Sequence, residues 1–373
     1  MTAEQRDPRS SEMRYDWLAD RWVIMAPNRT RRPNDFRCPP PTASDSQSCP
    51  FCAGHEAETP PALSVYGAGD DADTPWLVRV VPNKFPAVNG KSYVWPASDS
   101  AIPKSSPCSI DLYHRRELAG GHEVIVESPH HFSSLSQLSD QETALVFTAY
   151  RDRLRYWLQD RLISYAVVFK NSGLDAGASL AHIHSQLIAT DTVPADVFRL
   201  NQRMHQFLEQ EGECVFCRMV HTELEAEMRI VEATEDWLAF CPFASRLPGS
   251  VTILPRDHQT CFEQIDDRAV ASLARFMRRL VQRIEHCYPQ AAYNYVIHTA
   301  PGGSRESTAF HWRIEMFPRL TKVAGFEWGS ECYINPILPE HAAACYRQVG
   351  GKHSHHLQMH LPSVTPRRRA AER

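Results

Sequence analysis

The pattern of apolar and polar residues changes from strand-like to helix-like twice along this chain, in the same order each time. Residues 123–128 (EVIVES) and 251–255 (VTILP) are short β-branched runs of the kind that form strands. Residues 144–158 and 270–284 instead repeat their apolar side chains at the spacing of an amphipathic helix. After each helical run come another strand-like run, a glycine-containing loop and a strand that carries histidine. We therefore expect an α+β fold of two tandem units, each a mostly antiparallel sheet with a long helix, packed as a pseudo-dimer.

Cysteine and histidine positions follow the same repeat. Each unit contains a CxxC pair before this run of elements, CPFC in the first and CVFC in the second, and two histidines follow at matching distances. The resulting sets are Cys49, Cys52, His131 and His182, and Cys214, Cys217, His258 and His311. One CxxC pair alone is also typical of a redox motif or of buried thiols, but its repetition with matching histidines favours metal. Because four Cys and His ligands close a tetrahedral zinc site, two structural zinc ions are predicted.

His184 is the histidine that this repeat leaves unassigned. Side chains two residues apart on a strand share a face, so His184 and His182 should point to one place. The second unit has Arg313 where the first has His184, and Glu315 where the first has Gln186. The metal scaffold is thus kept twice but the extra imidazole only once, which predicts that His184 is the reactive group. Imidazole is neutral near pH 7 and attacks activated phosphorus, whereas a zinc ion with four protein ligands has no open position for direct catalysis.

The loop before His184 carries small and polar residues: Asn171, Gly173, Gly177 and Ser179. Glycine lets the backbone approach a phosphate closely, and the serine can add a hydroxyl donor. A plain tight turn would show the same glycines. Together with the unassigned histidine, the loop favours a site for nucleotidyl or phosphoryl transfer.

The length of 373 residues is sufficient for two such units with cores of their own. The expected boundaries are a disordered tail at 1–14, a first unit with zinc and the active histidine at 15–193, a second unit with the other zinc at 194–350 and a polar tail at 351–373. Residues near 194–213 would link the units.

Composition narrows the class of protein. Hydrophobic residues make up 43% and charged residues 23% of the chain, as in ordinary globular proteins. The net charge of -4 gives no general attraction to nucleic acid or to an anionic membrane, and finger spacing for a zinc-dependent nucleic-acid module is missing. We expect a cytoplasmic protein, because no long apolar run or signal peptide is visible, and the odd number of cysteines, 11, argues against a disulfide framework.

Several segments together resemble a known family. They are DWLADRWVIMAPNRTRRP, CPFC, VVPNKFPAV, ESPHH, NSGLDAGASLAHIHSQ and AGFEWGSECYINP, spread over roughly residues 15 to 350. In these segments the chain resembles the galactose-1-phosphate uridylyltransferases, a branch of the histidine-triad superfamily. The resemblance implies a double displacement in which His184 attacks the α-phosphorus of a nucleotide sugar. Sugar 1-phosphate leaves, and an acceptor phosphate then takes the nucleotidyl group.

The resemblance also implies roles for further residues. Gln186 would steady the transferred phosphate, and Asn171, Gly177 and Ser179 would hold phosphate oxygens. The other positions that match substrate-contacting residues of the family are Arg29, Arg32, Asn83, Gly173, Ala178, Gly325, Phe326 and Glu327. The segment 325–327 would contact the sugar from the second unit or from the partner subunit of a homodimer.

Two departures from the family pattern bear on the substrate. The usual motif HPHGQ is here HIHSQ, ending at Gln186, and CYINP with Tyr333 stands where the family has its hexose-binding glutamine. Both features resemble the plant ADP-glucose phosphorylase branch, which moves an adenylyl group to inorganic phosphate. The leading expectation is uridylyl transfer between UDP-glucose and a hexose 1-phosphate. The alternatives are an ADP-glucose phosphorylase and a zinc-stabilised nucleotide-binding protein without activity.

Overall fold

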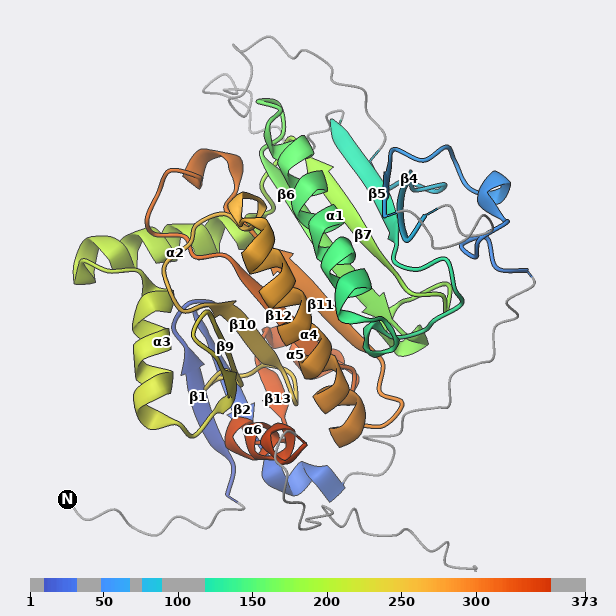
Figure 1. The fold of residues 1–373 in the computed structure, drawn as a ribbon. Helices are drawn as coiled ribbons and strands as arrows, with labels where there is room; N and C mark the ends of the chain where they lie inside the picture. Colours follow the sequence, from blue (N-terminus) through green and yellow to red (C-terminus); the bar gives the residue numbers. More distant parts are fainter. Residues whose placement is uncertain (1–9, 32–47, 68–75, 89–117, 350–373) are drawn as a thin grey trace, which may run out of the picture.

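A computed structural model describes residues 10–31, 48–67, 76–88 and 118–349 of the protein (Figure 1). Its strands are β1 (Glu12–Asp16), β2 (Arg21–Met25), β3 (Ser64–Tyr66), β4 (Val78–Pro82), β5 (Gly120–Val126), β6 (Tyr165–Ser172), β7 (His184–Thr190), β8 (Ile230–Ala233), β9 (Trp237–Phe240), β10 (Val251–Pro255), β11 (Tyr293–His298), β12 (Arg313–Pro318) and β13 (Tyr333–Asn335). Its α-helices are α1 (Asp140–Leu158), α2 (Ala195–Glu211), α3 (Val215–Ala226), α4 (Asp267–Cys287), α5 (Gly325–Ser330) and α6 (Pro339–Gln348). Among the short 3-10 helices is η1 (Pro27–Arg31).

Both repeats contribute to one continuous sheet of ten strands, in the order β3-β4-β5-β7-β6-β11-β12-β10-β9-β8. Every neighbouring pair in this sheet is antiparallel. β6 pairs with β11 in the middle, and the order β5-β7-β6 on one side is mirrored by β11-β12-β10 on the other. The α+β class with mostly antiparallel strands is confirmed, but the two expected sheets are joined edge to edge. Packing of the units as a pseudo-dimer stays a prediction.

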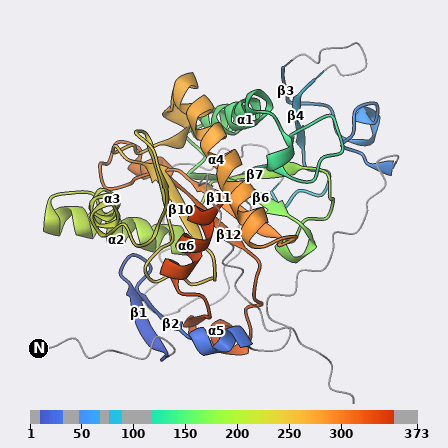
Figure 2. The same ribbon diagram turned by 60° about the horizontal axis from the view of Figure 1, so that its bottom comes forward.

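The two long helices α1 and α4 lie side by side across one face of this sheet (Figures 1 and 2). Each begins at a side chain that accepts a hydrogen bond from the first helical turn. The Ser139 hydroxyl accepts from the amide of Glu142 at 3.2 Å, and the Asp266 carboxylate accepts from the amide of Ala269 at 2.7 Å. These N-caps satisfy amides that have no partner within the helix, and they begin both helices at equivalent points of the repeat.

A smaller sheet of three strands, β1-β2-β13, brings the two ends of the described chain together, with β13 parallel to β2. β1 begins at Glu12, inside the segment expected to be a disordered tail, and Arg14 forms an ion pair with Glu340 at 2.8 Å. That expectation was therefore wrong for its last residues. The expected tail at 351–373 lies outside the described residues.

The segment expected to link the units is helical. α2 occupies most of it and ends at Gly212, whose φ of 75° is the left-handed conformation that glycine adopts readily at helix ends. Within the described ranges, no helix is long and apolar enough to cross a bilayer.

Candidate metal centres and active site

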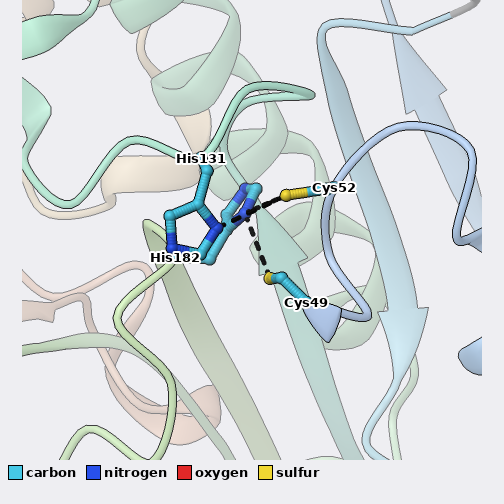
Figure 3. A group of neighbouring side chains, drawn as sticks. All are labelled: Cys49, Cys52, His131 and His182. Atoms are coloured by element: carbon cyan, nitrogen blue, oxygen red, sulfur yellow. Dashed lines mark hydrogen bonds between the residues drawn. The ribbon is translucent and has the colours of Figure 1, made fainter. Parts of the chain in front are cut away.

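The first cysteine and histidine cluster is assembled from three separated segments. Cys49 and Cys52 lie in the loop before β3, His131 follows β5, and His182 precedes β7. Figure 3 shows the four side chains pointing toward one another, with Cys52 Sγ 3.4 Å from His131 Nδ1 and both sulfurs 3.5 Å from His182 Nδ1. A tetrahedral metal with bonds of about 2.0 to 2.3 Å would separate its ligands by about 3.5 Å. The cluster thus has the donor atoms and spacing for a metal ion.

The second cluster repeats this arrangement. Cys217 Sγ lies 3.4 Å from His258 Nδ1 and 3.8 Å from His311 Nδ1, and Cys214 Sγ lies 4.0 Å from His311 Nδ1. In each cluster all four ligand atoms lie within 4.8 Å of one another. Both predicted sets of ligands are therefore brought together, and each could hold a metal ion.

Backbone carbonyls orient one histidine in each cluster. His182 Nε2 donates to the carbonyl of Ser128 at 2.8 Å, and His311 Nε2 donates to that of Pro255 at 3.1 Å. A hydrogen bond from the second ring nitrogen fixes the tautomer and leaves Nδ1 free to bind a metal. The two carbonyls come from equivalent positions, each three residues before the other histidine of its cluster.

His184 is the first residue of β7 and only 6% of its surface is exposed. Its Nδ1 donates to the carbonyl of His182 at 2.7 Å, so its lone pair is on Nε2. Burial lowers the pKa of His184, and the hydrogen bond to His182 opposes this shift without cancelling it. The ring is therefore neutral near pH 7, with Nε2 in the form that a nucleophile requires.

Phe51 connects the first cluster to this imidazole. It stands between the two cysteines, with its ring centroid 5.3 Å from that of His184 and 6.0 Å from that of His182. In the second unit the equivalent Phe216 packs under the guanidinium of Arg313, 4.8 Å away. The same scaffold thus presents an imidazole in one unit and a guanidinium in the other.

Gln186 lies on the same strand and is held by two neighbours. Its Oε1 accepts from His122 Nε2 at 2.8 Å and from Asn83 Nδ2 at 3.4 Å. The amide of Ala87 donates to His122 Nδ1 at 3.1 Å, which places the histidine proton on Nε2. With its oxygen engaged, Gln186 has its amide N–H groups available for an anionic ligand.

The motifs of the sequence do not single out His122, which is half-buried on β5. The missed signal was strand alternation. His122 lies two residues before Val124, which pairs with Gln186, so His122 and Gln186 share a face on adjacent strands.

The glycine-containing loop has the backbone that its sequence predicts. Gly173 and Gly177 have φ angles of 85° and 88°. A side chain on Gly173 would also meet Ala292 at 2.8 Å. Asn171 Oδ1 accepts from Asn294 Nδ2 at 2.8 Å, so its amide N–H groups, like those of Gln186, are left as donors.

This loop borders an open cleft of about 530 Å³, to which both units contribute. The residues that line it are Phe169, Asn171, Leu174, Asp175, Ala176, Gly177, Asn294, Tyr295, Val296, Phe317 and Arg319. A small crevice that shares Asn171 reaches Gly173 and His184. Ser179, exposed, and Ala178, buried, follow directly on Gly177.

Several predicted contacts do not line the cleft or the crevice. Near them in the described chain are Asn83, Ala178, Ser179 and Gln186, and the others lie on different elements. Arg29 lies in η1 and is exposed, and Gly325, Phe326 and Glu327 begin α5, next to β13. None of these four lines the cleft or the crevice in the described part of the chain. Arg32 lies outside the described residues.

Comparison with known proteins identifies the family. Residues 1–194 match the family model for the N-terminal domain of galactose-1-phosphate uridyl transferase, and residues 98–348 match a domain of unknown function. ADP-glucose phosphorylase of Arabidopsis thaliana is 33% identical, over 91% of this chain and 93% of its own. Galactose-1-phosphate uridylyltransferase of Thermotoga maritima is 25% identical, over 91% and 98%.

A solved structure agrees with these relatives. The crystal structure of an A. thaliana ADP-glucose phosphorylase with bound ADP-glucose matches with a TM-score of 0.73 and 32% identity, covering 91% of this chain and 98% of that one. The family model alone spans more than half of the 373 residues. The chain therefore belongs to the galactose-1-phosphate uridylyltransferase family of nucleotidyltransferases.

Proposed function

We propose that this protein is an ADP-glucose phosphorylase, which moves the adenylyl group of ADP-glucose to inorganic phosphate through His184. The observation that carries the chemistry is the buried neutral imidazole whose Nδ1 is bound to the carbonyl of His182. The relative at 33% identity supports the adenylyl donor over the uridylyl donor that the family resemblance had placed first.

In the first step, His184 Nε2 attacks the α-phosphorus of ADP-glucose. A P–N bond forms, the bond from this phosphorus to the bridging oxygen breaks, and glucose 1-phosphate leaves with the electron pair. An oxygen of inorganic phosphate then attacks the same phosphorus, the P–N bond breaks, and ADP leaves while Nε2 regains its lone pair. The amides of Asn171 and Gln186 supply N–H donors for the phosphate oxygens, and Ser179 and Asn83 would contact the donor nearby.

We propose zinc for both metal centres, because each offers two thiols and two imidazoles at tetrahedral spacing. With four protein ligands, the ion in each centre has a structural role. In the first centre His182 contributes Nδ1 to the metal and its carbonyl to His184, so the metal ligand also fixes the ring of the nucleophile.

We further propose that the chain acts as a homodimer. Arg29, Gly325, Phe326 and Glu327 match substrate-contacting positions of the family but stand away from the cleft of their own chain. Phe326 is 52% exposed, and Trp328 on the same helix is 73% exposed. Exposed aromatic side chains are typical of interfaces, so α5 could deliver these residues to the cleft of a partner subunit.

Mass spectrometry of the intact protein, after brief exposure to ADP-glucose without phosphate, tests the donor. We expect a mass gain of one adenylyl group, which phosphate then removes with release of ADP. UDP-glucose should give no corresponding gain.

The second candidate is uridylyl transfer to a hexose 1-phosphate, which the matches to the uridylyltransferases favour. A uridylyl gain with UDP-glucose and none with ADP-glucose would establish that candidate instead. Absence of any gain with either nucleotide sugar would reject both transferases and leave the nucleotide-binding protein.

His122→Phe should slow adenylyl transfer by about tenfold, because loss of one hydrogen bond worth about 1 to 1.5 kcal/mol frees Gln186 to rotate its amide. The measurement is the rate of adenylyl-protein formation in a single turnover. His286→Phe, an exposed position on α4, is the matched control and should keep the full rate. Equal rates for the two variants would contradict the role of His122.

A further inference from the structure

A buried ion pair lies beneath the reactive histidine, on the face of the sheet that α1 covers. Glu127 is 0% exposed and Lys170 1% exposed, and their carboxylate and ammonium groups are in direct contact. Lys170 Nζ also donates to the backbone carbonyl of His184 at 3.1 Å. The ion pair therefore contacts the nucleophilic residue through its backbone rather than through its ring.

The hydroxyl groups of three residues connect the Glu127 carboxylate to β7, to α1 and to β11 of the second unit. Ser185, which follows His184, donates to the Glu127 carboxylate, as does Tyr150 from α1. The hydroxyl of Tyr150 lies 2.6 Å from that of Ser185 and 2.7 Å from that of Tyr295 on β11. Both residues 184 and 185 are thus tied to the same buried charges.

The sheet hydrogen-bond ladder explains why His184 requires such a contact. On the β6 side, pairing with β7 stops at Gln186, opposite Phe169, two residues short of His184. In the second unit the corresponding ladder continues to Arg313, opposite His298. Lys170 therefore supplies the donor for a carbonyl that the β6 backbone leaves unpaired.

The second unit serves as an internal comparison for the ion pair itself. The N-caps Ser139 and Asp266 align the helices α1 and α4 together with the strands β6 and β11 that follow them, and His182 and His311 align β7 with β12. In this alignment the counterparts of Tyr150, Lys170 and Ser185 are the fully buried residues Met277, Ile297 and Ile314. The segment that corresponds to Glu127 is Leu254 and Pro255. At these positions, therefore, the second unit keeps the same fold and the same Cys/His cluster with apolar residues.

Buried charges are costly to desolvate, and an apolar replacement of similar volume is often at least as stable. The second unit shows that neither the fold nor the metal centre needs the ion pair. We propose that Glu127 and Lys170 are positioning residues that hold the backbone of His184 for in-line attack, while the carbonyl of His182 holds its ring. The inference rests on the proposed function, because it concerns the rate at which His184 is adenylylated.

The test replaces both charges together, in Glu127→Leu/Lys170→Met, so that no buried charge is left unpaired. The matched control is Glu123→Leu/Arg153→Met. That ion pair, at 2.6 Å, is also buried between β5 and α1, but it has no hydrogen bond to residue 184 or 185. The readouts are the single-turnover rate of adenylyl-protein formation at saturating ADP-glucose, the Kd for ADP-glucose, and Tm.

We expect the first double variant to form the adduct at least about tenfold more slowly than the control, because small misplacements of a nucleophile have large effects on rate. Its Kd and Tm should match those of the control. Equal rates in the two double variants, with adduct formation in the unmodified protein, would overturn the positioning role alone. Absence of adduct in the unmodified protein would overturn the proposed function, and this inference with it.

If the double variant does not fold, Ser185→Ala provides the test with the loss of one hydroxyl and no charge. A rate reduced by about threefold or more, with unchanged Kd, would support the positioning role, since the hydroxyl ties the same strand to Glu127. An unchanged rate would overturn it.

Discussion

Replacing His184 with alanine is expected to lower the rate of nucleotidyl transfer by at least about 10⁴-fold, as removal of a covalent nucleophile does in other enzymes. Alanine has no lone pair with which to form the P–N bond. The substitution removes one ring from beside Phe51 and leaves the metal ligands untouched. The loss of stability should therefore be small beside the loss of activity.

Arg313→Ala is the matched control for this substitution, because Arg313 stands at the equivalent position of the second unit. It should lose its bond to Glu315, 2.8 Å long, and keep adduct formation. Intact mass and steady-state turnover, measured for both variants with Tm, separate chemistry from folding. Retention of more than about 1% of the transfer rate in His184→Ala would show that another group is the nucleophile.

Removing the thiols of the first metal centre, in Cys49→Ser/Cys52→Ser, should be the most destabilising change among these predictions. Loss of a structural metal is among the few changes that exceed about 4 kcal/mol, which for a chain of 373 residues corresponds to a fall in Tm of roughly 5 °C. The protein that still folds should form adduct more slowly. The His182 carbonyl positions the ring of His184, and His182 itself is held less firmly once it has no metal to bind.

The equivalent change in the second centre, Cys214→Ser/Cys217→Ser, provides the comparison. It should lower Tm by a similar amount and leave the rate per folded molecule nearly unchanged, since Arg313 replaces the reactive histidine there. Elemental analysis should find two zinc ions in the unmodified protein and one in each variant. The structural assignment would be wrong if the unmodified protein held no metal, or if only the second pair of substitutions abolished adduct formation.

Much of this architecture could be predicted from the sequence because the chain contains its own comparison. Repeated CxxC pairs with matching histidines predicted two groups of four side chains that the structure brings together, and the presence of Arg313 in place of His184 singled out the imidazole that we propose as the nucleophile. The long helices were expected within a few residues of their observed ends, because their apolar faces and capping residues are local features.

Other features depend on contacts that no local pattern records. The pairing of β6 with β11 joins distant segments, so one sheet was found where two were expected. α2 was taken for a linker although its sequence is helical. His122 and Glu127 are polar residues in and beside a largely apolar strand. Only the neighbouring strands and α1 reveal that His122 orients Gln186, and that Glu127 accepts from the Ser185 hydroxyl and pairs with Lys170.

Because β6 pairs with β11, neither repeat alone has all the backbone partners of its sheet. Separating the repeats would leave residues 168–172 of β6 and 293–297 of β11 without the backbone partners that they have in this sheet. The first repeat carries His184, but alone it would lack the second unit's side of the cleft and would present an unpaired strand edge prone to aggregation. Because the two repeats share one sheet, the second can carry a guanidinium in place of the imidazole and still complete the hydrogen bonding of the first.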